Sequence, residues 1–147
     1  MLMDECSGWA YLDETGSCYL FVEEKKNWTD ANAYCDKLAP GATLPSIHSS
    51  ESNHFISSLA GSSTFWIGGL RDITSPAGWK WTDESLWDYQ NWNSNQPGHG
   101  YNHIVITGST HSTPNKWYTR NDGSSYGVVC QLSLKYQLVG SKGKYKK

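Results

Sequence analysis

The residues best suited to bind a ligand lie in the second half of the chain, in and beside a long irregular stretch. They combine amide and imidazole groups with aromatic rings that can stack on a ligand: Trp87, Gln96, His99, Tyr101, Asn102 and Tyr118. Long loops on a rigid scaffold commonly carry recognition. We therefore expect a binding surface on and beside the loop from Arg71 to Gly100, with these six residues as candidates.

The same region offers little for catalysis or for a transition metal. His99, His103 and His111 could take Zn²⁺ or Cu²⁺, but no spacing fixes their geometry. The sequence gives no defensible Ser–His–Asp order, carboxylate pair in a cleft or phosphate-binding Gly-x-Gly-x-x-Gly loop. The chain is therefore predicted not to be an enzyme.

Length and composition point to one domain with an aromatic core. A chain of 147 residues can bury a sizeable core, and its formal net charge of −2 does not favour nucleic acid. No apolar run is long enough to span a membrane. Residues 1–5 are too short and too acidic for a signal peptide and are interpreted as an N-terminal remnant. Nothing in the sequence indicates an oligomeric state.

Among the tryptophans, we expect five to lie in the core: Trp66, Trp79, Trp81, Trp92 and Trp117.

Four cysteines suit disulfides better than zinc, because no Cys-x-x-Cys pair occurs. They allow three connectivities. A turn signal at residues 14–16 favours a hairpin closed by Cys6–Cys18, which leaves Cys35–Cys130 to join the first helix to the last strand. Closing that loop of about 95 residues would stabilise the fold by roughly 4–5 kcal/mol. Disulfides imply an oxidising, extracellular compartment, and four unrelated buried thiols in a cytosolic protein are the alternative.

The order of the elements predicts an α+β fold in which the helices precede most of the antiparallel strands. Thr29 is the expected N-cap of the first helix. The inward face of that helix would hold Ala31, Tyr34, Cys35 and Leu38. We expect helices at about 30–38 and 49–60, strands at 17–22, 64–70, 103–107, 116–119 and 126–132, and a long irregular stretch up to residue 100.

The motifs, taken in order, resemble the C-type lectin-like domain family. They are Trp28-Thr29-Asp30-Ala31 with Cys35, Leu44-Pro45-Ser46-Ile47-His48, Trp66-Ile67-Gly68-Gly69-Leu70, Trp79-Lys80-Trp81-Thr82-Asp83, Asn91-Trp92 before Gln96-Pro97, and Trp117 followed by Val129-Cys130. The resemblance covers residues 6–132. It implies a C-type lectin-like fold with two helices, two small antiparallel sheets and a long loop excursion, stapled by disulfides.

Further expectations follow from this resemblance. Cys6–Cys18 looks like the extra bridge of the family's long form, and residues 66–96 look most like secreted invertebrate members. Residues 133–147 fall outside the family's motifs. We expect them to form a flexible, solvated basic tail, with attraction to anionic glycans or cell surfaces as the alternative.

The calcium chemistry of the family is mostly missing. Its sugar loop usually reads E-P-N or Q-P-D and its later strand W-N-D, and the five ligand positions hold Gln96, Gly98, Tyr101, Tyr118 and Thr119 here. Only Gln96 matches, and Asp72 is the one acidic residue at the auxiliary site. Calcium takes six to eight oxygen ligands. We therefore expect no calcium at the usual sites and no other cofactor.

A disulfide of the family is also missing, and His103 and Asp122 stand in the two places that it would join. They could pair and partly replace the bridge, since a carboxylate near an imidazole raises the pKa of the histidine. The alternative is that they are two unrelated surface residues. Asn27-Trp28-Thr29 is a possible N-glycosylation site at a helix start.

The resemblance and the departures from it together predict a secreted recognition module. Its ligand would be a glycan or a protein, bound without the usual calcium-dependent sugar site. The aromatic residues of the loop could stack on a sugar or serve only to pack the loop. A carbohydrate-binding lectin with residual calcium dependence is the alternative.

Overall fold

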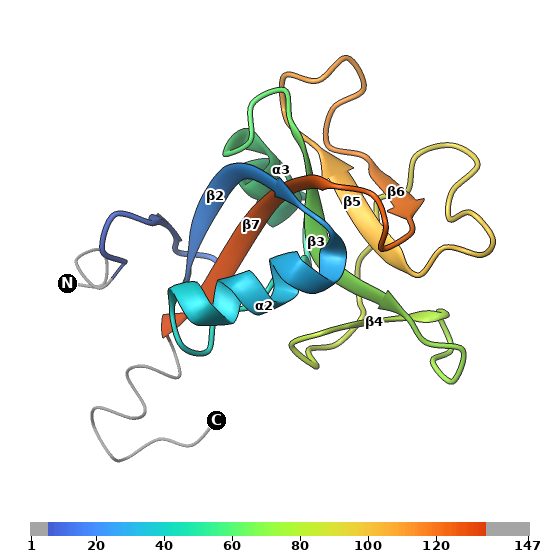
Figure 1. Ribbon diagram of the computed structural model, residues 1–147, viewed down its shortest axis with the longest axis horizontal. Helices are drawn as coiled ribbons and strands as arrows, with labels where there is room; N and C mark the ends of the chain where they lie inside the picture. The colour runs from blue at the N-terminus through green and yellow to red at the C-terminus, as the bar shows by residue number, and fades with distance from the viewer. Residues whose placement is uncertain (1–5, 135–147) are drawn as a thin grey trace.

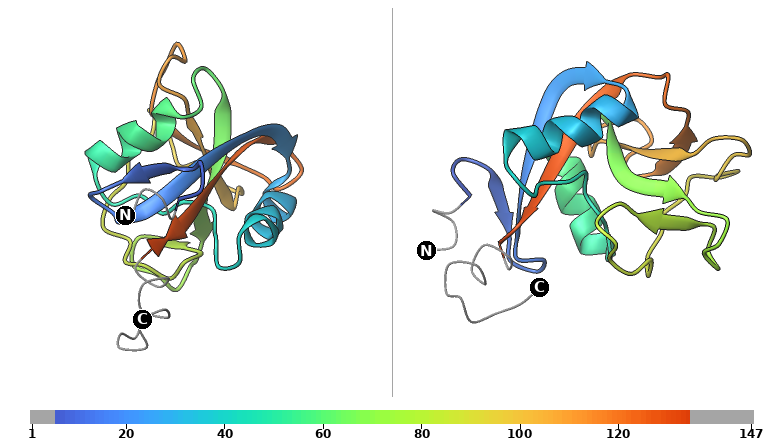
Figure 2. Two further views of the ribbon diagram at one scale, coloured as in Figure 1. Left: turned by 90° about the vertical axis from the view of Figure 1, so that its left-hand side faces the viewer. Right: turned by 60° about the horizontal axis from the view of Figure 1, so that its bottom comes forward.

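Seven strands joined in one sheet form the centre of the molecule, with a helix on either side (Figures 1 and 2). The computed structural model describes residues 6–134. Its elements are β1 (Ala10–Leu12), β2 (Ser17–Lys26), α2 (Trp28–Leu38), α3 (Ser50–Ser58), β3 (Thr64–Arg71), β4 (Trp79–Trp81), β5 (His103–Thr107), β6 (Trp117–Arg120) and β7 (Tyr126–Ser133).

The strands form a single mixed sheet, which corrects the expectation of two small antiparallel sheets. Its order is β1-β2-β7-β3-β5-β6, and β4 pairs with β3 outside this path. The strand β3 runs parallel to β7 and is bonded to it at Phe65–Gly127 and Trp66–Val128, whereas every other pair is antiparallel. This short parallel ladder joins the strands near the termini to those that carry the long loop.

Alternating side chains bury both faces of the sheet. Phe65 and Ile67 of β3 pack with Ile56 of α3, whereas Trp66 between them packs with Ala31 and Cys35 of α2. A strand turns successive side chains to opposite faces, so this alternation places one helix on each face.

Four of the five tryptophans predicted to be core are fully buried, and Trp92 is half-buried against the core on the α3 side of the sheet. Leu38, predicted to point inward from α2, is exposed instead because it ends the helix.

The first helix begins two residues earlier than predicted. Asn27, not Thr29, is its N-cap, and the Asn27 side-chain oxygen accepts a hydrogen bond of 2.8 Å from the backbone N–H of Asp30. The earlier start brings Trp28 into the helix, where it is buried, and frees Thr29 to contact Asp122. Asn and Thr both cap helices well, so burial of Trp28 decides between them.

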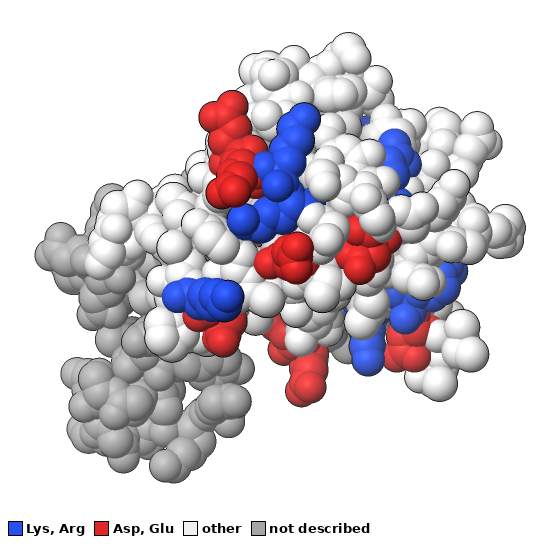
Figure 3. Space-filling view, viewed as in Figure 1, with Lys and Arg blue, Asp and Glu red and all other residues white. Residues whose placement is uncertain are grey.

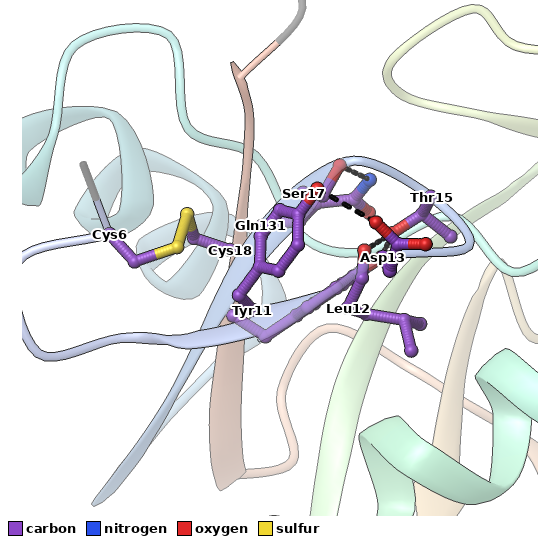
Figure 4. Close-up of a disulfide and its surroundings, with 9 residues drawn as sticks. Cys6, Tyr11, Leu12, Asp13, Thr15, Ser17, Cys18 and Gln131 are labelled. Carbon is purple, nitrogen blue, oxygen red and sulfur yellow. Dashed lines mark hydrogen bonds between the residues drawn. A yellow bond between two sulfur atoms is a disulfide. The ribbon is translucent and has the colours of Figure 1, made fainter. Parts of the chain in front are cut away.

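Both expected disulfides, Cys6–Cys18 and Cys35–Cys130, are present. Cys6–Cys18 lies beside the β1–β2 hairpin (Figure 4), and Leu134 is buried against it. The folded part therefore extends past residue 132: Ser133 belongs to β7, and the N–H of Leu134 donates to the carbonyl of Gly16. The predicted remnant 1–5 and the rest of the predicted tail, 135–147, lie outside the described residues.

Replacing Asn27 tests the corrected helix start. Asn27→Ala should lower the free energy of unfolding by about 1 kcal/mol, because one backbone donor loses its cap. Asn27→Asp keeps an accepting oxygen and should stay close to the wild type. Urea unfolding of the two variants measures the difference, and equal stabilities would show that this side chain does not cap the helix.

Candidate functional site

The long loop between β4 and β5 rests on a base of tryptophan rings. Trp87 stacks on Trp81 with ring centroids 4.5 Å apart, and Trp92 packs edge-on against Trp117 at 5.6 Å. Trp81 and Trp117 are both buried. Trp87, predicted to contact a ligand, thus has one ring face covered by the core. This stacking packs the loop onto the core, because such aromatic contacts bury large apolar areas.

The side-chain oxygen of Gln96 is already bonded within the protein. Thr119 of β6 donates to it twice, from its backbone N–H and from its hydroxyl, at 2.9 Å each. The same hydroxyl accepts a 2.9 Å hydrogen bond from the N–H of Gly98. Thr119 is buried, which makes these bonds costly to lose. Three of the five expected ligand positions therefore come together and bind one another.

A side chain that the sequence did not single out as functional secures the other end of this turn. Arg71, the last residue of β3, donates from Nη2 to the carbonyl of Gly98 and from Nε to the carbonyl of Tyr101, at 2.8 Å each. Its guanidinium lies 4.5 Å from the centre of the Trp79 ring. The only sequence signal was its position at the end of a buried strand that precedes the loop.

The second half of the loop, which contains the turn, carries no formal charge of its own. From Tyr89 to Asn115 the chain has no Asp, Glu, Lys or Arg. At the right-hand edge of Figure 3, the loop is correspondingly white. Arg71 therefore supplies a positive charge to a turn that has no carboxylate of its own.

The oxygen atoms of this turn do not fit a calcium site. The cation needs six to eight oxygens, usually with carboxylates among them. Here Gln96 Oε1 accepts two hydrogen bonds, and the carbonyls of Gly98 and Tyr101 face a guanidinium. Within residues 6–134, no three His, Cys, Asp or Glu side chains come together as a possible metal site.

Asp72, expected at the auxiliary calcium site, is used locally. Its Oδ1 accepts bonds from the hydroxyl and the backbone N–H of Thr74, at 2.6 and 3.0 Å. These two bonds hold the pKa of Asp72 below its usual value, the hydroxyl bond contributing most. The carboxylate therefore shapes the β3–β4 turn.

The remaining candidate residues differ in how open they are. His99, Tyr101 and Asn102 are exposed, with Tyr101 at 41%. Tyr118 is half-buried, and the guanidinium of Arg120 lies 5.3 Å from its ring centre. The accessible part of the candidate site is thus the outer side of the turn from Gln96 to Asn102.

His103 and Asp122 do not form the direct pair considered above. Asp122 instead accepts two hydrogen bonds from Thr29, from its N–H at 2.9 Å and its hydroxyl at 2.8 Å. His103 stacks on Trp28 with centroids 4.2 Å apart, and its Nδ1 is buried without a hydrogen-bond partner. The two residues still help to join α2 to β5 and β6, but through different neighbours.

The pKa directions follow from these contacts. Burial lowers the pKa of His103 and outweighs the opposing influence of Asp122, which corrects the expected rise. The backbone N–H of Thr29 is the main cause that lowers the pKa of Asp122. The fold therefore favours neutral His103 beside a charged Asp122.

A serine, a histidine and an aspartate also meet near the start of the loop, in an order that the sequence did not indicate. Ser85 Oγ lies 3.1 Å from His48 Nε2, and His48 Nδ1 lies 2.7 Å from Asp88. The Ser85 hydroxyl, however, donates to Asp83 at 2.5 Å, so its proton points at a carboxylate rather than at the imidazole. The group therefore ties the loop to the segment before α3 and is not an activated nucleophile.

Comparison with known proteins identifies the family. The family model described as "Lectin C-type domain" matches residues 24–132. A protein named "Lectin" from Pleurodeles waltl is 33% identical over 122 residues, which cover 80% of this chain and 70% of the relative. A "C-type lectin galactose-binding isoform" from Pseudechis porphyriacus is 38% identical over 99 residues, which cover 64% of this chain and 62% of the relative.

A solved structure agrees with these matches. The crystal structure of the cow C-type carbohydrate-recognition domain of CD23 superposes with a TM-score of 0.71 and 34% identity, covering 85% of this chain and 92% of that one. The chain belongs to the C-type lectin domain family, and the predicted family and fold are confirmed.

The family is in general non-enzymatic. Neither helix in residues 6–134 is long and apolar enough to cross a membrane. The likeness to invertebrate members stays a prediction.

Replacing His103 tests its preference for the neutral state. A histidine with a lowered folded-state pKa contributes less stability as the pH falls, because the unfolded chain takes up its proton more readily. Wild-type stability should therefore decline from about pH 7.5 to about pH 5. His103→Phe keeps a ring on Trp28 and should reduce this decline, whereas the exposed-site control His99→Phe should not. Urea unfolding of both variants across this pH range measures the decline in stability. A decline in His103→Phe equal to that of the wild type would refute the lowered pKa of His103.

Proposed function

We propose that this chain is a secreted recognition module that binds a glycan through the outer side of the Gln96–Asn102 turn and requires no calcium. The bonding of the Gln96 oxygen carries the proposal: both of its hydrogen bonds come from Thr119. A calcium ion would have to break them and would gain no carboxylate ligand in return.

A glycan is the ligand class that the relatives favour. The family model, the galactose-binding relative and the carbohydrate-recognition domain of CD23 all bear names from sugar recognition. The turn also offers suitable groups, since Tyr101 is an exposed ring and His99 and Asn102 are exposed hydrogen-bonding side chains. The apolar face of a sugar can stack on an aromatic ring while its hydroxyl groups bond to the neighbouring amide.

Secretion is supported by the covalent chemistry of the chain. Two disulfides close the fold, and such bonds persist in oxidising compartments. Asn27 would be a glycosylation acceptor there, because helix capping uses its oxygen and leaves its nitrogen for the glycan.

A calcium-dependent lectin is the second candidate. Gln96-Pro97 keeps the first two residues of a sugar-binding motif, and a relative is named as galactose-binding. For this candidate, the turn would have to rearrange so that Gln96 exchanges Thr119 for the metal.

A glycan array separates these candidates. The wild-type protein should bind the same glycans in millimolar calcium and in excess chelator. Tyr101→Ala should weaken this binding by about tenfold or more, because a stacked aromatic ring is lost. Leu38→Ala is a matched control: Leu38 is 40% exposed, close to the 41% of Tyr101, but it lies on α2.

Three results would count against the proposal. Binding that disappears in chelator would favour the calcium-dependent lectin. Binding that is equal in Tyr101→Ala and wild type would place the ligand elsewhere. A flat response to every glycan, together with direct binding of a purified protein partner, would favour protein recognition.

A further inference from the structure

We infer that Arg71 is the positioning residue of the binding turn, and that its guanidinium holds the backbone of the turn in place without a metal ion. This inference rests on the proposed calcium-independent function and names what keeps the turn ordered. It concerns the shape of the turn and not direct contact with the ligand.

The contacts of Arg71 reach the turn at three residues. Its side chain donates to the carbonyls of Gly98 and Tyr101, and its backbone N–H donates to the carbonyl of Asn102 at 3.0 Å. The accepting residues span the exposed end of the loop. One side chain on a rigid strand therefore holds both sides of the turn.

The position of the guanidinium is itself fixed. It lies over the ring of Trp79, which is buried, so the aromatic face sets the plane of the charged group. The ion pairs found within residues 6–134 do not include Arg71. Its positive charge is directed at the two carbonyl dipoles, and no carboxylate of the described part of the chain forms an ion pair with it.

An arginine is well suited to this task. The guanidinium is planar, stays charged at all ordinary pH values and donates several hydrogen bonds in fixed directions. Like a cation, it gathers carbonyl oxygens from separate parts of the backbone. Unlike a bound metal, it cannot be removed by a chelator. The turn should therefore be ordered before any ligand or metal arrives.

Contacts with Thr119 on the opposite side of the turn also hold its backbone in place. Thr119 holds Gln96 and the N–H of Gly98, while Arg71 holds the carbonyl of Gly98. A Cβ added at Gly98 would lie 3.0 Å from the Thr119 hydroxyl oxygen and 3.2 Å from the Tyr101 ring. Gly98 is therefore clamped between β6 and Arg71, with little room for the larger residue of the usual motif.

Amide hydrogen exchange of the ligand-free protein tests the inference. Arg71→Met keeps an apolar chain on Trp79 but loses the charge and the donors. It should speed exchange at Gly98 and at residue 71 by about tenfold or more, because hydrogen bonds to a charged group are lost. Arg71→Lys keeps the charge without the fork and should give a smaller increase.

Arg120→Met is the matched control. Arg120 also lies over an aromatic ring and donates to a backbone carbonyl, that of Thr119, but it does not reach the turn. Exchange at Gly98 in this variant should equal that of the wild type.

Millimolar guanidinium should slow exchange at Gly98 in Arg71→Ala, while the same concentration of sodium chloride should not, because only guanidinium restores the missing donors.

Equal exchange at Gly98 in Arg71→Met and wild type would overturn the inference. So would an increase in Arg71→Met that Arg120→Met matches, or an Arg71→Lys variant that exchanges as fast as Arg71→Met. These outcomes require no ligand, so they are separate from a failure of the proposed function, which the glycan array detects. If Arg71→Met does not fold, the comparison of Arg71→Lys with wild type decides.

Discussion

The hydrogen bonds around Gly98 are the constraint on which the shape of the candidate site depends. Thr119 binds the Gln96 oxygen and the Gly98 N–H, and Arg71 binds the Gly98 carbonyl. The partners lie on β6 and β3, two strands of one sheet. Because these partners are anchored in the core, the turn inherits the rigidity of the sheet. These contacts are the basis of the proposal that the turn binds its ligand without calcium.

Contacts within the chain also join the first helix to the strands at His103 and Asp122, the two positions that the family resemblance assigns to a missing disulfide. Asp122 is bonded to Thr29 on α2, and His103 is stacked on Trp28 of the same helix. Neither contact equals a covalent bond in strength, since single hydrogen bonds contribute about 1 kcal/mol. The large tryptophan base beneath the loop and the Cys35–Cys130 disulfide remain to hold the scaffold. In both places, contacts within the chain hold segments that are far apart in the sequence.

Sequence patterns predicted the scaffold better than the site. The two helices, five of the seven strands and four of the buried tryptophans follow from local periodicity and ordered motifs, whereas β1 and β4 were not predicted as strands. The disulfide pairing was predicted from a turn signal and from the family resemblance. The parallel β3–β7 pairing depends on residues about 60 apart, and no local pattern encodes it. Arg71 was missed for a related reason. An arginine after a strand looks like a solvated charge, and its role requires the backbone carbonyls of a loop nearly 30 residues later. The stacking of Trp87 on Trp81 could not be predicted either, because a tryptophan in a loop can face the core or the solvent.

The claim that the turn is held by protein groups alone is tested most directly by titrating the ligand-free protein with calcium and following its backbone amides by NMR. We predict that the signals of Gln96, Gly98 and Thr119 stay in place up to millimolar calcium and do not move when chelator is added. A saturable shift confined to these three residues, reversed by chelator, would contradict the claim. It would mean that calcium displaces Thr119 from Gln96 and organises the turn as a metal site.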